Sequence, residues 1–125
     1  MKVIERATKH YHSQEKLVIL VPEWGDETGP LEVHIFPMTM SEVNTMQKMN
    51  RKKVGGMEQA VNLIIVKARD KDGNRLFSLQ DHEALMQNVD YQVVERIATG
   101  IKQRFFSDVE TQKGNSEETH SGAAS

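Results

Sequence analysis

One continuous stretch, Asp70 to Asp81, constrains this chain most, because it combines an acidic turn, an apolar pair and a helix start signal. The turn is Asp-Lys-Asp-Gly-Asn, in which Asx side chains cap their own backbone and Gly supplies a positive φ. The apolar pair is Leu76-Phe77, which we expect to anchor the turn to a core. The capping-box spacing that begins at Ser78 then predicts a short helix ending near Met86.

The same stretch can also be interpreted as a degenerate calcium loop. Asp70, Asp72 and Asn74 would fill its first, third and fifth ligand positions. Arg75 stands where such a loop requires Gly, and a left-handed backbone disfavours a side chain of this size. The last position is Asp81, which is shorter than the Glu that binds calcium in bidentate geometry. The sequence favours the structural turn, and a calcium-responsive binding module remains an alternative function.

Composition limits the class of protein. A chain of 125 residues fits a single domain with a modest core. The formal net charge is −2, so no global field favours nucleic acid or a membrane surface as a partner. There are no cysteines, which excludes disulfides and thiol catalysis. No apolar run approaches the roughly 20 residues that span a bilayer, and the N-terminus lacks the apolar core of a signal peptide.

The predicted fold class is α+β, with an N-terminal β-hairpin packed against about four α-helices. Residues 16–21 form a continuous apolar run, which predicts a strand buried on both faces. Residues 31–36 alternate between apolar and polar side chains, which predicts a second strand with one buried face. The Gly-rich acidic segment 25–29 between them predicts a hairpin with a long loop.

Two helices are predicted to follow the hairpin. The capping-box spacing from Thr39 to Glu42 opens a helix that runs to about Lys52, before Gly55-Gly56. Residues 57–68 are apolar nearly all round a helix, so this helix should be central and the most buried. A strand through residues 63–66 is the competing interpretation, because short β-branched runs fit both periods.

The last predicted helix is capped by Asp90 and includes Gly100, a small residue that allows close packing. Its expected buried stripe consists of Val94, Ile97, Ala98, Ile101 and Phe105. We expect a single α+β domain over residues 1–107. The acidic, Ser- and Gly-rich residues 108–125 hold almost no apolar anchors and cannot offset their ordering entropy, so this tail is expected to be disordered.

Polar clusters give no support for enzymatic activity. His10-Tyr11-His12 could chelate a metal from a strand, but no third ligand is evident nearby, so surface histidines are favoured. Asp81-His82-Glu83 suggests acid–base chemistry, yet consecutive residues of a helix point apart. The sequence contains no nucleophile elbow, phosphate-binding Gly loop or zinc-type spacing. We therefore expect a non-enzymatic protein with no catalytic, cofactor-binding or metal-binding residues.

A methionine-rich region is the best candidate for a partner surface. Five of the seven methionines fall between Met38 and Met57, and such surfaces bind varied apolar helices. Ordinary core filling is the alternative for any single methionine. A basic cluster at the end of the first helix complements the helix dipole and could also attract an acidic partner. The predicted partner-binding residues are Met40, Met46, Met49, Met57, Lys52 and Lys53.

The order of short motifs along the chain resembles a known family. Val-Pro-Glu-Trp-Gly (Val21 to Gly25) precedes a second strand and a helix. Asp-x-Asp-Gly-x-x-Leu-Phe (Asp70 to Phe77), Asp-x-x-x-Leu (Asp81 to Leu85) and a final helix follow. This order resembles the tail assembly chaperones of long-tailed, non-contractile (siphovirus-type) phages from about Leu17 to Phe105. The residues before Lys16 fall outside the resemblance.

The resemblance implies a chaperone that binds the tape measure protein, keeps it soluble and helps recruit tail-tube subunits. It implies a place in the cytoplasm of the infected bacterial host and absence from the mature virion. A programmed frameshift near the gene's end would produce an extended form of the chain, with residues 108–125 as the linker, and self-association in many copies is expected. A structural tail or head–tail joining protein retained in the virion is the alternative.

Overall fold

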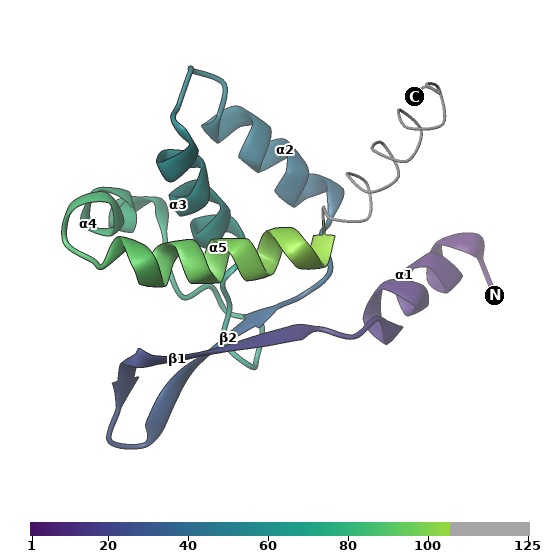
Figure 1. The fold of residues 1–125 in the computed structure, drawn as a ribbon. Coiled ribbons are helices and arrows are strands. Elements are labelled where there is room, and N and C mark those ends of the chain that lie inside the picture. The colour runs from purple at the N-terminus through teal and green to yellow at the C-terminus, as the bar shows by residue number, and fades with distance from the viewer. Residues whose placement is uncertain (106–125) are drawn as a thin grey trace, which may run out of the picture.

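The computed structural model describes residues 1–105, and its architecture confirms the predicted α+β class (Figure 1). The predicted tail, residues 108–125, lies outside the described residues. The elements in chain order are α1 (Val3–Ser13), β1 (Leu17–Asp26), β2 (Gly29–Ile35), α2 (Met40–Met49), α3 (Gly56–Lys67), the short 3₁₀ helix η1 (Leu79–Asp81), α4 (His82–Gln87) and α5 (Tyr91–Phe105).

The first helix, α1, is an addition to the four helices expected after the hairpin. It buries none of its residues, although Val3, Ile4, Ala7 and Tyr11 are spaced along one side of a helix, a pattern that was not used in the prediction. Glu5 caps its first turn by accepting a hydrogen bond from the backbone N–H of Lys2 at 3.0 Å. In Figure 1 this helix projects away from the other helices and leads directly into β1.

The hairpin formed by β1 and β2 is confirmed, but its predicted long loop is wrong. The strands pair antiparallel from Leu17↔Ile35 to Val21↔Leu31, and Asp26 pairs with Gly29 after a register shift. Only Glu27 and Thr28 therefore lie in the turn, and Gly29, the first residue of β2, adopts a φ of 129° that favours glycine. The Asp26 carboxylate also holds the turn by accepting from the backbone N–H and hydroxyl of Thr28, at 2.9 and 2.6 Å.

The prediction that residues 16–21 are buried on both faces is wrong. Val18 and Leu20 are 40% and 55% exposed, whereas Val21 of β1 and Val33 of β2 are fully buried. Helices α2 to α5 lie on one side of the two-stranded sheet (Figure 1). On the opposite face Val18 and Leu20 remain exposed, while His34, the partner of Val18, is buried. An apolar run alone could not reveal how many faces of the strand are covered, because the same run occurs in strands with two buried faces and in strands with one.

Helix α3 is the centre of the molecule, as predicted, and the competing strand through residues 63–66 is wrong. Every residue from Ala60 to Ala68 is buried. The helix packs against α2, α4 and α5. The core cluster around it draws on β1, β2, α4 and α5 through Val21, Val33, Ile35, Leu85, Val93, Val94, Ile97, Ala98 and Ile101. None of the helices within residues 1–105 is both long and apolar enough to span a bilayer.

Helix α5 begins and packs as its sequence predicts. Asp90 accepts a hydrogen bond from the backbone N–H of Gln92 at 2.9 Å. Val94, Ile97, Ala98 and Ile101 are buried, and Phe105 is partly buried. Gly100 does allow a close approach, although its neighbour is β1: a Cβ there would lie 3.0 Å from Cδ1 of Ile19.

We expect Gly25→Ala to destabilise the hairpin. A Cβ at Gly25 would overlap the carbonyl oxygen of Gly29 and lie 2.9 Å from Cα of Pro30, and backbone atoms cannot move aside as a flexible side chain can. Thermal denaturation should show a loss of about 1–3 kcal/mol. Gly56→Ala is the control, because its Cβ would meet no atom within 4 Å. Equal stability of the two variants would contradict the steric conflict proposed at Gly25.

Candidate functional site

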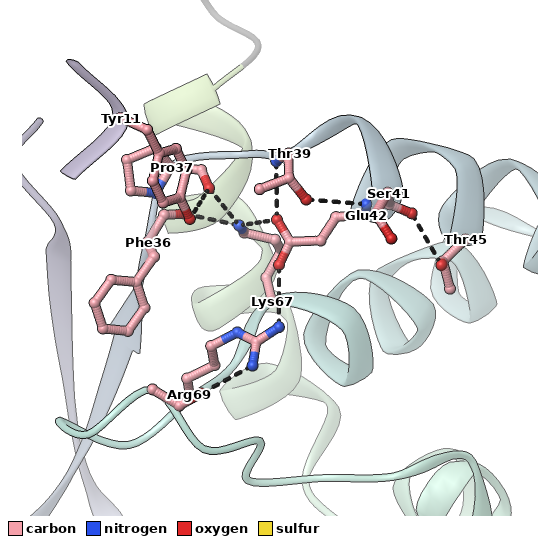
Figure 2. A network of polar contacts seen from close by, with 10 residues as sticks. Tyr11, Phe36, Pro37, Thr39, Ser41, Glu42, Thr45, Lys67 and Arg69 are labelled. Atoms are coloured by element: carbon pink, nitrogen blue, oxygen red, sulfur yellow. Dashed lines mark hydrogen bonds and ion pairs between the residues drawn. The ribbon is translucent and has the colours of Figure 1, made fainter. Parts of the chain in front are cut away.

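A buried polar network joins α3 to α2 and to the end of β2 (Figure 2). The Lys67 side chain is fully buried. Its Nζ donates to Oε1 of Glu42 at 2.8 Å and to the backbone carbonyl of Phe36 at 2.7 Å. A third, longer hydrogen bond of 3.4 Å reaches the carbonyl of Pro37. Since an ammonium group has three donors, Lys67 is fully satisfied inside the protein.

Glu42 is the counter-ion of this network and also the capping residue of α2. Its Oε1 accepts from the backbone N–H of Thr39 at 3.1 Å, and the hydroxyl of Thr39 accepts from the backbone N–H of Glu42 at 3.2 Å. Its Oε2 accepts from Arg69 at 3.3 Å. The predicted capping box is therefore confirmed, and the same carboxylate is shared with two cations that the sequence alone did not assign to it.

The network fixes the charge of its members. Burial lowers the pKa of Lys67, while the hydrogen bond that Lys67 donates to Glu42 opposes that change. Burial alone would raise the pKa of Glu42, but hydrogen bonds from Lys67 and Thr39 outweigh it and hold that pKa below its usual value. Glu42 is thus a carboxylate at neutral pH, and the pair is a buried ion pair.

An open pocket of about 450 Å³ lies beside the network. Its aromatic lining includes Tyr11 from α1 and Phe36 from the end of β2. Its cationic lining consists of Arg69, Lys71 and Arg75, which surround the acidic turn. We call this site, defined by those five residues, the basic pocket. A lysine at the end of an otherwise apolar helix, Lys67, is the sequence signal for the network beside this pocket, and it was not used in the predictions.

The predicted methionine surface is partly assembled by the fold. Met46 lines a shallow pocket of about 340 Å³ on α2 together with Met38 and Val43, which we call the methionine groove. Met40 and Met57 are 83% and 57% exposed at the beginnings of α2 and α3 and do not line this groove.

The other predicted partner-binding residues lie beside the groove or in the loop that follows it. Met49 packs partly against the core. Lys52 and Lys53 are exposed in the connection between α2 and α3. Helix α2 ends at Met49, earlier than predicted, so these lysines follow the helix instead of forming its last turn. Partner binding by these residues stays a prediction.

The acidic stretch is a fixed turn. Oδ1 of Asp70 accepts from the backbone N–H groups of Asp72 and Asn74, both at 2.9 Å. Gly73 adopts a φ of 88°, as the turn prediction requires. Because its carboxylate already binds the chain's own backbone, Asp70 favours the structural turn over the calcium loop. Within residues 1–105, no group of three His, Cys, Asp or Glu side chains could hold a metal ion.

The fold places the predicted histidine clusters on helices, where they form neither a chelating pair nor a catalytic pair. His10 and His12 lie on helix α1, so the strand geometry assumed for a chelating pair is wrong. Tyr11 between them donates its hydroxyl to the carbonyl of Pro37 at 3.1 Å. His82 contacts Glu58 at 3.2 Å, and Asp81 caps η1 by accepting from the backbone N–H of Ser78 at 2.8 Å. The fold does not bring Asp81 and His82 into a catalytic pair.

The three short motifs of the sequence meet at one place. Phe77 packs edge-to-face on Trp24 with ring centroids 6.1 Å apart. Trp24, Phe77 and Leu85 line a single open apolar pocket of about 330 Å³, with Leu31 and Val89 completing its wall. Each motif thus contributes one large apolar side chain to the same site, which we call the motif pocket.

Comparison with known proteins places the chain near one solved structure. No family model matches the sequence, and no curated protein matches it. The fold is similar to the structure of the bacteriophage HK97 tail assembly chaperone, with a TM-score of 0.45 and 16% sequence identity. The match covers 75% of this chain and 96% of that chain.

We expect Glu42→Gln to destabilise the protein strongly. The variant removes the charge that compensates buried Lys67, and breaking a buried ion pair from one side costs about 3 kcal/mol or more. Chemical denaturation measures the loss. Glu23→Gln is the matched control, because Glu23 pairs with Arg96 at 2.7 Å on the exposed surface, where such pairs contribute little. Similar losses in both variants would show that the Glu42 network does not stabilise the core.

Glu42 should also account for part of the loss of unfolding free energy at acidic pH. The folded-state pKa of Glu42 is depressed, so its contribution is complete above the unfolded value of about 4.3 and is lost as pH falls through the folded value. The difference in unfolding free energy between wild type and Glu42→Gln should therefore shrink below about pH 4. Denaturation curves from pH 7 to pH 3 measure this difference. A constant difference across that range would contradict the depressed pKa.

Proposed function

We propose that this protein is a non-enzymatic tail assembly chaperone of a long-tailed phage. In this role it binds the tape measure protein, keeps it soluble and helps recruit tail-tube subunits. It acts in the cytoplasm of the infected bacterial host, associates with further copies of itself and with a frameshift-extended form, and is absent from the mature virion. The proposal starts from the resemblance carried by the motifs around Trp24, Phe77 and Leu85.

The single observation that most supports the proposal is the convergence of those motifs in space. They are separated by tens of residues in the chain, yet Trp24, Phe77 and Leu85 line the same pocket. The turn from Asp70 positions Phe77 by fixing the backbone before it. The resemblance therefore rests on side chains that pack together as one structural unit.

The surface chemistry suits a client that exposes an apolar helix. Met38 and Met46 line the methionine groove, and Met40 and Met57 are exposed at the beginnings of α2 and α3. Methionine side chains are flexible and polarisable, so they adapt to different apolar ridges. Lys52 and Lys53, both exposed, would attract acidic positions of the client and speed its association. Binding of this kind shields a coiled-coil client reversibly.

Co-expression with the tape measure protein tests the proposal. The wild-type chain should keep that protein soluble and co-purify with it. The double variant Met40→Glu and Met57→Glu would place two charges in the apolar interface and should weaken binding at least about tenfold, equivalent to about 1.4 kcal/mol. Met86→Glu is the matched control, because Met86 is also an exposed methionine, 42% exposed on α4, and is not among the predicted partner-binding residues.

Two outcomes would oppose the proposal. A client that stays insoluble with both the wild-type chain and its frameshift-extended form would exclude the chaperone role. Recovery of the chain at stoichiometric level in purified particles would instead indicate a structural tail or head–tail joining protein. Equal loss of binding in Met86→Glu would show that the methionine region is not the specific surface.

A further inference from the structure

We propose that the basic pocket binds the chain's own acidic C-terminal segment, residues 108–118. This interaction would make the segment an internal occupant of a surface site, separate from the methionine groove. The inference goes beyond the chaperone role and holds independently of any client. It rests on the charge of the pocket, the charge of the segment and the point at which α5 ends.

The pocket carries cations that its own fold does not neutralise. Lys71 and Arg75 are exposed and form no ion pair within residues 1–105. Arg69 is held toward the pocket by hydrogen bonds to Oε2 of Glu42, at 3.3 Å, and to the carbonyl of Gly73, at 2.9 Å. These three cations surround one opening and create a local positive potential.

Two carboxylates also line the pocket, and they do not cancel this potential. Glu42 is already compensated by Lys67 and Arg69. Asp72 is the remaining acidic side chain of the lining. A further cation, Lys16, stands 5.4 Å above the ring of Phe36, which is part of the pocket wall. The site is therefore net positive, with aromatic surface beneath the charges.

The sequence after α5 has the complementary charge. Residues 108–118 contain four carboxylates and one lysine. The acidic positions are Asp108, Glu110, Glu117 and Glu118. The net charge of the segment is therefore −3. Carboxylates of this kind can form bidentate hydrogen bonds with the guanidinium group of Arg75.

The last described helix ends close to the polar network beside the pocket. Helix α5 ends at Phe105, whose ring lies 5.2 Å from Nζ of Lys67. The same Nζ is 2.8 Å from Glu42, which lines the pocket. An extended chain reaches roughly 3.4 Å per residue, so the first acidic positions can span the short distance from Phe105. Such a tether gives a local concentration in the millimolar range, which makes weak charge pairing sufficient for binding.

Spin labelling of the full-length chain tests this contact. The chain has no cysteine, so Ser116→Cys gives a single attachment site for a nitroxide. The label should broaden the amide signals of Gly73 and Asn74, which lie in the turn at the pocket. Lys71→Glu with Arg75→Glu should abolish that broadening. The control is Lys52→Glu with Lys53→Glu, which makes the same charge change in the connection between α2 and α3.

High salt and neutralisation of the acidic residues provide two further tests. Broadening should also disappear at high salt, where exposed charges are screened, and after Asp108→Asn, Glu110→Gln, Glu117→Gln and Glu118→Gln are combined. Broadening that persists in the pocket variant, or that is lost equally in the control, would overturn the proposal. So would its complete absence in the labelled chain at low salt. None of these outcomes bears on client binding, so the two proposals can fail separately.

Discussion

The buried ion pair between Lys67 and Glu42 is the interaction on which the rest of the structure depends. Lys67 is the last residue of the central helix α3, and Glu42 lies in the first turn of α2. Phe36, whose carbonyl accepts a hydrogen bond from Lys67, directly follows β2. A buried ammonium without partners costs several kcal/mol. These elements must therefore assemble together, and the entry to α2 is set by the same contacts that terminate α3.

A second constraint is that the helices cover one face of a two-stranded sheet (Figure 1). A lone hairpin is only marginally stable in water, so β1 and β2 depend on their contacts with α5 and with the motif pocket. Gly100 lets Ile19 approach α5 closely, and Trp24 packs on Phe77. This arrangement leaves Val18 and Leu20 exposed on the face of the sheet opposite the helices.

Helix α2 separates two chemically different surfaces. Val43 and Met46 line the methionine groove, whereas Glu42 lines the basic pocket. An apolar client and an acidic segment would therefore be recognised at different sites of one small domain. This separation follows from helical periodicity, since adjacent residues of a helix point to different sides.

The sequence by itself determined the local structure. Periodicity identified the buried face of α5 and the central helix α3, and side-chain chemistry identified the caps at Thr39 and Asp90 and the turn at Asp70. Only the tertiary structure decided which strand face is covered and that Lys67 shares Glu42 with Arg69. It also decided that the three motifs meet in one pocket. These features depend on contacts between residues distant in the chain, which no local pattern records.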